Sequence, residues 1–212
     1  MQLESINVGL VETISHKSKS LTTGICKYPV IGSVYLDEAG VRGDAIVDQK
    51  HHGGTDQAVY AYSADDYDWW EKETGREYSP GLFGENLTIR GLPSDMNVGD
   101  RLLIREVVLE ATAPRIPCST FAARMQDSGF GMAFRTAERP GIYFRVLNSG
   151  EVSAGDAVTY VANDSSNVSI LDLFRFYYAL HHEIADLHNF LAAPLAIRFR
   201  DKIEGKLEGL GE

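Results

Sequence analysis

Cysteine, long apolar runs and positive charge are all scarce in this sequence of 212 residues. The two cysteines, Cys26 and Cys118, lie far apart in the chain, and we expect two separate thiols in a reducing compartment. Two are also too few for an iron–sulfur cluster with four cysteine ligands. No stretch offers the roughly 18 uninterrupted apolar residues of a membrane span, and the N-terminus lacks a basic start followed by an apolar run. These absences predict a cytoplasmic protein with no membrane partner.

The charge balance excludes another class of partner. Twenty Lys and Arg stand against thirty Asp and Glu, which gives a net charge of −10 at pH 7. This balance argues against binding to nucleic acid or to an acidic membrane face, because both attract an excess of positive charge. A site for an anion must therefore be a local cluster of basic residues. The chain also has no G-x-G-x-x-G fingerprint and no P-loop.

From Leu3 to about Val161 the pattern is mostly short strands divided by glycine turns. β-Branched and aromatic residues with partial alternation predict strands at 5–14, 32–37, 58–63, 86–92, 101–112, 141–147 and 156–161. Three strand entrances share a Gly-Asp pair, in which we expect glycine at positive φ and aspartate bonded to nearby backbone, at residues 43–44, 99–100 and 155–156. Two helices are expected between strands. One covers 64–75, capped by Ser63 and stopped by Gly75, and the other covers 118–129.

The composition changes after residue 162. "NDSSN" is a polar linker, and the chain beyond it has apolar residues at helical spacing. We therefore divide the chain into a mostly β domain at 1–162 and a C-terminal extension of three short helices at 163–212. The helices should pack on an apolar flank of the first domain or pair with a second copy of the chain in a homodimer, because the following side chains need a partner surface: Leu171, Phe174, Tyr178, Leu187, Phe190 and Leu191.

The segment "HHEIADLH" in this extension resembles the H-E-x-x-H helix of zinc proteases. His182 and Glu183 are followed by Asp186 where the second histidine should stand. His182 and Asp186 on one helix face, with His181 or His188 nearby, leave a metal site open as an alternative. The favoured interpretation is a solvated helix face.

A second chemically distinctive segment is "ATAPRIPCSTFAARM". Pro114 and Pro117 hold Arg115 and Cys118 in a non-helical lead, so that the cysteine falls at or beside the first residue of a helix. Helix amides and a nearby guanidinium both stabilise a thiolate, which lowers the pKa of a thiol from about 8.5. Cys118 is thus a candidate for chemistry, with a small buried side chain as the alternative. Cys26 has no such setting and is expected to be structural.

Residue types alone leave two mechanisms for Cys118. It is either a nucleophile activated by His52, as in cysteine hydrolases, or a ligand to a soft metal centre. The surroundings favour a bulky anionic ligand, because basic residues near turns, prolines or a helix start are joined by two glycines whose amides can approach a phosphate. These basic residues are Lys27, Lys50, Arg115 and Arg124.

Five segments occur in the order and spacing of the MOSC family, the domain named after the C-terminal part of molybdenum cofactor sulfurases: "TGICKYPV", "VRGDAIVDQKHHGGTDQAVYAYS", "FGENLTIRGL", "VGD" and "APRIPCSTFAARM". The chain is most similar to YiiM-type members, which carry a short three-helix extension. The resemblance covers nearly all of the sequence. It implies a mostly β, barrel-like domain with a few helices, a small C-terminal helical bundle, and a site for the molybdenum cofactor, a molybdopterin with a phosphate tail.

The resemblance also implies roles for individual residues. Cys118 matches the cysteine that ligates molybdenum, and His52 and Asn86 are expected to act with it in catalysis. The other expected cofactor contacts, beside His52 and Asn86, are Lys27, Lys50, Gly53, Gly54, Phe83, Gly84, Glu85, Arg115, Ser119 and Arg124. Purely structural roles stay open as alternatives for some of these residues. His52 could brace its loop, Asp44 and Glu85 could be turn residues, and the two glycines could serve backbone conformation alone.

Proteins similar to YiiM reduce N-hydroxylated compounds such as 6-N-hydroxylaminopurine to amines, which consumes two electrons and two protons. Because this chain has no dinucleotide fingerprint and no cluster cysteines, the resemblance implies an external reductase, expected to contain flavin. Two other hypotheses remain. One is a non-catalytic carrier or binding protein for the cofactor or for sulfur, and the other is the cysteine hydrolase that uses Cys118 and His52.

Overall fold

The computed structural model describes residues 1–16, 19–48, 53–164 and 167–211. About 30% of the chain is helical and about 32% lies in strands. Eight strands form one sheet in the order β13-β9-β10-β11-β7-β8-β1-β4, in which only the β7–β8 pair is parallel. Their bounds are β1 (Gln2–Gly9), β4 (Lys27–Pro29), β7 (Val59–Ser63), β8 (Leu87–Arg90), β9 (Arg101–Ile104), β10 (Val107–Pro114), β11 (Ile142–Asn148) and β13 (Thr159–Val161).

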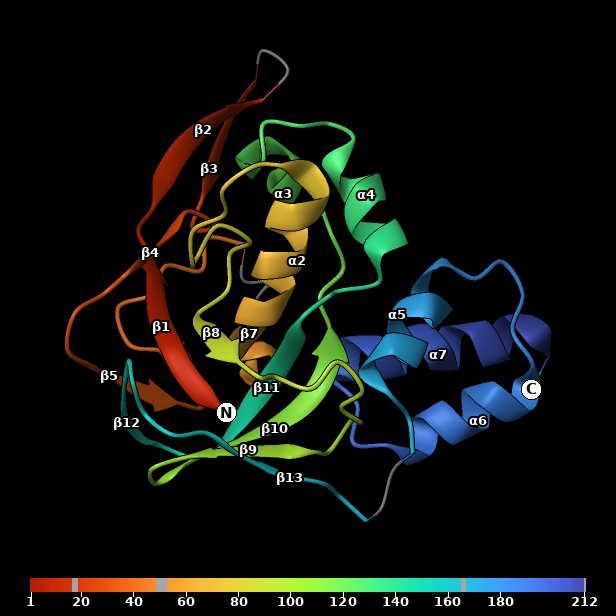
Figure 1. Cartoon of the computed structure of the whole chain (residues 1–212). Helices are drawn as coiled ribbons and strands as arrows, with labels where there is room; N and C mark the ends of the chain where they lie inside the picture. Colours follow the sequence, from red (N-terminus) through yellow and green to blue (C-terminus); the bar gives the residue numbers. More distant parts are fainter. Residues whose placement is uncertain (17–18, 49–52, 165–166, 212) are drawn as a thin grey trace.

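Smaller elements complete the fold. A hairpin is formed by β2 (Glu12–His16) and β3 (Lys19–Thr23). A three-stranded sheet is formed by β5 (Ser33–Asp37), β6 (Gly40–Val41) and β12 (Gly150–Ser153). The helical elements are η1 (Thr55–Gln57), α2 (Ala64–Thr74), α3 (Ser119–Arg124), α4 (Phe130–Ala137), α5 (Ile170–Tyr178), α6 (Ile184–Ala192) and α7 (Ile197–Leu210). In Figure 1 the last three lie at one flank of the large sheet.

The expected barrel is not closed. Among the residues that the structure describes, β4 and β13 are the two edges of the large sheet, and the fold mixes sheet and helix more evenly than a mostly β domain would. The sheet curves strongly, since the amide of Leu3 donates to the carbonyl of Asp156 at 2.9 Å and Leu3 accepts from Gly155 at 2.7 Å. Strand alternation reports which face of a strand is buried, but it does not report whether the outer strands meet.

The Gly-Asp turns confirm their prediction for glycine. All three glycines have positive φ, at 88°, 92° and 94° for Gly43, Gly99 and Gly155. In two of the pairs the aspartate also bonds nearby backbone: Asp100 accepts from the amide of Asn97, and Asp156 accepts from the amide of Ser153, each at 2.7 Å. Asp44 behaves differently and belongs to the site described below.

Helix α2 begins and ends close to its predicted bounds. Ser63 is its N-cap and accepts from the amide of Asp65 at 3.2 Å, and Gly75 ends it in the left-handed region at φ 67°. The prediction of a single helix over 118–129 is wrong. Helix α3 ends at Arg124, the chain turns at Gln126 with φ 51°, and α4 then begins at Phe130.

The strand prediction over 101–112 is also wrong in one respect. It is a hairpin, in which β9 and β10 are joined by a tight turn with Arg105 at φ 52°. Positive φ is uncommon for arginine and glutamine, so neither this turn nor the one at Gln126 has a glycine or asparagine to mark it in the sequence.

The C-terminal extension has the three predicted helices, and its apolar residues pack against the rest of the chain. Phe174 and Leu187 are buried, and four partly buried side chains pack on the same core, those of Leu171, Tyr178, Phe190 and Leu191. The Phe174 ring lies 6.4 Å from that of Phe134 in α4. One core therefore continues across residue 162, while the division into two domains stays a prediction. None of the described helices is long and apolar enough to span a membrane.

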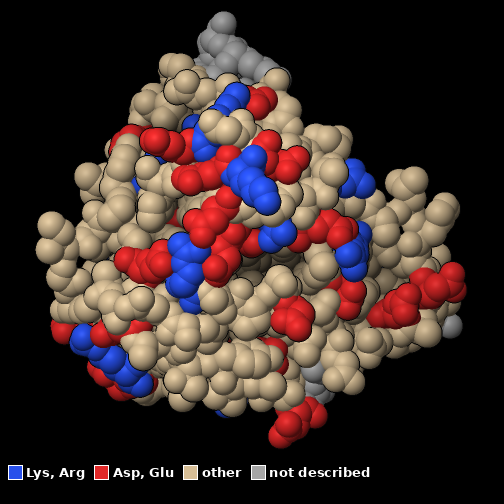
Figure 2. Space-filling view, viewed as in Figure 1, with Lys and Arg blue, Asp and Glu red and all other residues tan. Residues whose placement is uncertain are grey.

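Acidic and basic side chains alternate on the face that carries α2 (Figure 2). Arg139 pairs with Asp66, and Arg90 lies within 3.1 Å of three carboxylates, those of Glu4, Asp65 and Asp68. Exposed pairs of this kind contribute little to stability. They do show that Arg90 and Arg139 are already paired with local carboxylates.

Candidate functional site

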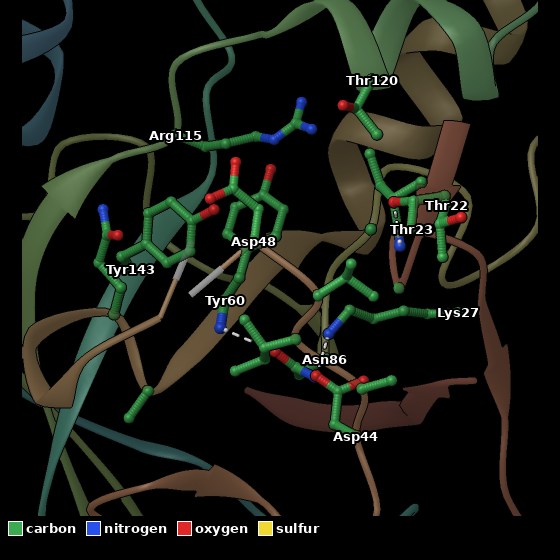
Figure 3. A pocket seen from close by; sticks show the side chains of 18 of the residues that line it. Thr22, Thr23, Lys27, Asp44, Asp48, Tyr60, Asn86, Arg115, Thr120 and Tyr143 are labelled. Carbon is green, nitrogen blue, oxygen red and sulfur yellow. Dashed lines mark hydrogen bonds and ion pairs between the residues drawn. The ribbon is translucent and has the colours of Figure 1, made fainter. Parts of the chain in front are cut away.

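A cavity of about 150 Å³ opens between β3, the chain before η1, β7 and the start of α3 (Figure 3). Segments far apart in sequence supply its walls, because β7 is central in the sheet and the loops at its end converge there. Its polar lining side chains are those of Thr22, Thr23, Lys27, Asp44, Asp48, Gln57, Tyr60, Asn86, Arg115, Thr120 and Tyr143.

Arg115 lies at one end of the cavity and is only 3% exposed. It follows β10 directly, and its guanidinium carbon lies 3.8 Å from the centroid of the Phe121 ring in α3. Its Nη1 is buried and has no hydrogen-bond partner among the described residues. A buried cationic donor left without an acceptor costs free energy, so this nitrogen is available to donate to an anionic ligand.

Tyr60 and Tyr143 stand beside Arg115, with their hydroxyl groups toward it in Figure 3. Their rings are 5.0 Å apart, and the Tyr60 hydroxyl donates to the carbonyl of Pro140 at 2.9 Å. Burial raises the pKa of both hydroxyls, and the opposing effect of Arg115 is smaller. Both therefore stay protonated at neutral pH, as polar groups beside the unpaired guanidinium nitrogen.

The other end of the cavity holds Lys27, Asp44 and Asn86. The Lys27 ammonium pairs with the Asp44 carboxylate, which also accepts from Asn86 Nδ2 at 2.9 Å and from the amide of Gly9 at 2.7 Å. Burial lowers the pKa of Lys27, and the charge of Asp44 opposes this.

Cys118 is the N-cap of α3, as predicted, and it is half-buried. It is not among the residues that line the cavity, although Thr120 two positions later is. Residues on either side of it in sequence do line the cavity, namely Arg115 and Thr120, and Cys118 itself packs on the core. Cys26 is 1% exposed, and burial raises the pKa of its thiol, which fits the structural role expected for it.

The F-G-E-N element has two faces. Gly84 and Asn86 line the cavity, whereas Phe83 is buried in a cluster of aromatic rings. Asn86 also fixes the backbone of β7, because its Oδ1 accepts from the amide of Tyr60 at 3.2 Å. Glu85 is fully buried on the other side and does not line the cavity. Contacts of Phe83 and Glu85 with a cofactor stay predictions.

Glu85 gives a prediction of pH dependence. Its carboxylate accepts from the amide of Gly81 at 2.6 Å and from the hydroxyls of Thr88 at 2.8 Å and Tyr67 at 2.9 Å. Burial nevertheless raises the pKa of this carboxyl. A raised folded-state pKa contributes stability that is complete below the ordinary value of about 4.3 and is lost as pH rises through the folded-state value. The wild type should therefore lose unfolding free energy relative to Glu85→Gln as pH rises from about 4.

Urea unfolding of both proteins at a series of pH values measures this difference. A difference that stays constant, or that moves in favour of the wild type as pH rises, would contradict the raised pKa of Glu85.

Four further predicted residues do not line the cavity: Gly53, Gly54, Ser119 and Arg124. Gly53 is buried and Gly54 has φ 101°, but neither lines the cavity. Ser119 is exposed at the start of α3, and the guanidinium carbon of Arg124 lies 5.7 Å from the ring of Tyr28. Lys50 and His52 fall outside the described residues. The roles of all six in binding stay predictions.

Three prominent cavity residues were missed by sequence reasoning, namely Asp44, Tyr60 and Tyr143. Asp44 was read as a turn residue, although it lies in one of the five family segments. The tyrosines were read as ordinary members of alternating strands, and burial of an aromatic residue in a strand does not reveal that its hydroxyl faces a cavity.

The segment "HHEIADLH" does not assemble a metal site. Among the described residues, no group of three or more His, Cys, Asp and Glu side chains could hold a metal ion. Helix α6 begins only at Ile184, so that His182 precedes it and does not share a helix face with Asp186. The His182 ring instead packs 4.4 Å from that of Phe176.

Comparison with known proteins identifies the family. The MOSC domain family matches residues 48–159, more than half of the chain, and the chain belongs to this family. The protein YflK of Bacillus subtilis, which is described as uncharacterized, is 34% identical over 78% of this chain and 76% of its own.

The structural comparison agrees. The crystal structure of YiiM from Geobacillus stearothermophilus superposes with a TM-score of 0.80 at 28% identity, and the match covers 97% of this chain and 98% of that one. The chain thus has a YiiM-like fold that includes the C-terminal helices. A protein of Gibberella moniliformis named "Reductase" is 31% identical over 88% of this chain, but the chain spans only 34% of that protein.

Proposed function

We propose that this protein is a molybdenum-cofactor-dependent reductase of N-hydroxylated compounds, such as 6-N-hydroxylaminopurine, with Cys118 as the ligand to molybdenum. The observation that carries the proposal is Arg115, which is buried at the cavity and has an unpaired guanidinium nitrogen in a protein of the MOSC family. A charged donor of this kind is suited to an anionic ligand such as a pterin phosphate.

The donor set fits the cofactor chemically. Two buried cations that line the cavity, Arg115 and Lys27, would hold its anionic part, and Cys118 at the N-cap of α3 would offer the soft ligand that molybdenum prefers. Lys27 already forms an ion pair with Asp44, so we expect Arg115 to be the stronger contact for an anion. Asn86 and the tyrosine hydroxyls would then orient polar groups of the pterin or the substrate.

The reaction converts R–NHOH, two electrons and two protons into R–NH₂ and water. When bound, the cofactor would supply the two-electron reduction of the N–O bond. The chain itself would bind and orient the reactants and keep the hydroxyls of Tyr60 and Tyr143 protonated beside them.

The electrons would come from an external reductase, which we expect to contain flavin, in the cytoplasm. In the Gibberella protein named "Reductase", roughly two thirds of the chain lies outside the part that matches this protein.

Turnover separates the reductase from its alternatives. Full-length protein from a host that makes the cofactor should reduce 6-N-hydroxylaminopurine with a reduced viologen dye as the artificial electron donor, and should lose this activity when the cofactor is removed. Cofactor that binds and exchanges without any turnover would instead indicate a carrier. Hydrolytic activity in the metal-free protein that requires Cys118 would indicate a cysteine hydrolase.

A further inference from the structure

The segment Gly53–Ala58 forms part of the cavity wall, since Gln57 and Ala58 both line the cavity. It contains the short turn η1. The amide of Gln57 donates to the carbonyl of Gly54 at 3.0 Å, and η1 has no side-chain N-cap. A single turn with so few internal bonds depends on contacts from elsewhere for its position.

One of those contacts comes from β10, where the Thr112 hydroxyl donates to the carbonyl of Asp56 at 2.6 Å, and others come from the C-terminal extension. Arg198, in the first turn of α7, donates from Nη2 to the carbonyl of Gly53 at 2.7 Å and from Nη1 to the side chain of Gln57. One guanidinium thus joins both ends of the wall segment, although about 140 residues separate it from them in sequence. The charge of Arg198 also acts on a residue of the cavity, Tyr143. Burial raises the pKa of Tyr143, Arg115 lowers it, Cys118 raises it, and Arg198 lowers it by the smallest amount.

Asp56 adds a second connection beside the first. Its carboxylate accepts from the amide of Ile197 at 2.8 Å and pairs with Arg145 at 3.0 Å. Arg145 in turn donates to the carbonyls of Pro194 and Leu195 at 3.1 and 3.2 Å. The residues just before Arg198 are therefore held against the wall segment by polar contacts, Ile197 directly and Pro194 and Leu195 through Arg145.

We infer that Arg198 is a positioning residue of the site: through Gly53 and Gln57, the C-terminal extension fixes the cavity wall and thereby sets the affinity of the cavity for its ligand. This inference rests on the proposed function for the identity of the ligand. The contacts of Arg198 with Gly53 and Gln57 do not depend on that function. Helical spacing predicts only that the extension packs on an apolar flank of the first domain or pairs with a second copy of the chain.

Arg200 provides a matched control in the same helix. Its Nη2 donates to the carbonyls of Leu191 and Ala193 at 3.0 and 3.1 Å, so these bonds stay within the extension. Full-length Arg198→Met and Arg200→Met variants would be compared in two measurements. One is hydrogen–deuterium exchange of the segment 53–58, and the other is affinity for molybdopterin, determined by pterin fluorescence.

Arg198→Met should speed hydrogen exchange of the segment and weaken molybdopterin binding about tenfold or more, because the loss of a contact that supports a binding site typically has an effect of this size. Arg200→Met should leave the exchange of the segment and the affinity for molybdopterin unchanged, even if its melting temperature falls as much as that of Arg198→Met. Arg198→Lys, which keeps the charge but offers a single nitrogen, should lie between the wild type and Arg198→Met, and it replaces Arg198→Met if that variant does not fold.

Equal exchange and equal affinity in the Arg198 and Arg200 variants would overturn the inference. If the wild type itself binds no molybdopterin, the proposed function fails, and the exchange of 53–58 alone then decides whether Arg198 holds the wall.

Discussion

Serine in place of Cys118 is expected to abolish the retention of molybdenum while leaving the fold intact. A serine hydroxyl is far harder to deprotonate than a thiol, and as an oxygen donor it is a poor match for a centre that prefers soft ligands. Cys118 is the N-cap of α3, and serine is itself a good N-cap, so the helix should form in the variant as it does in the wild type. Metal analysis of the purified variant, with circular dichroism to verify folding, measures the effect.

Cys26→Ser is the control for this experiment. Cys26 is buried and does not line the cavity, and its substitution should lower stability without removing the metal. Equal molybdenum content in the wild type and the Cys118→Ser variant would refute the assignment of Cys118 as the ligand.

Replacing Arg115 by methionine should weaken binding of molybdopterin by about ten- to a hundredfold, because hydrogen bonds to a charged group contribute roughly 1.5–3 kcal/mol. Methionine preserves much of the packing on Phe121, so the loss would report the missing guanidinium. Lys27→Met should also weaken binding and should lower stability as well, since it leaves the buried Asp44 carboxylate without its cationic partner. Titration of each variant with molybdopterin gives the affinities.

Arg139→Met is the matched control for the arginine. Arg139 also has a buried Nε without a hydrogen-bond partner among the described residues, but it pairs with Asp66 and does not line the cavity of Arg115. Its substitution should reduce stability and leave affinity unchanged. Similar losses of affinity in both variants would mean that the effect is one of stability, and unchanged affinity in Arg115→Met would place the anion site elsewhere.

The fold could be predicted from the sequence wherever local chemistry determines local structure. Ser63 and Gly75 mark the two ends of α2, and the three Gly-Asp turns have the expected positive φ. The prediction fails where unfavourable conformations are imposed by tertiary structure, as at Arg105 and Gln126. Closure of the sheet was beyond reach for a different reason, because it depends on how strands curve and pair over the whole domain.

The candidate site divides in the same way. Lys27, Asn86 and Arg115 line one cavity, and their residue types and spacing pointed to a polar, anion-binding site. Asp44 and the two tyrosines were missed, because their place in the cavity follows from the crossing of distant strands. Arg198 was equally hidden, since nothing in the periodicity of a helix shows which backbone carbonyl its side chain will reach.

Whether the cavity beside Cys118 holds the molybdenum cofactor is measured most directly by metal and pterin analysis of the full-length wild-type protein, purified from a host that synthesises the cofactor. We predict that molybdenum and pterin copurify with the protein in equal amounts. Protein that carries neither, while a molybdoenzyme produced in the same cells is fully loaded, would contradict the proposed function.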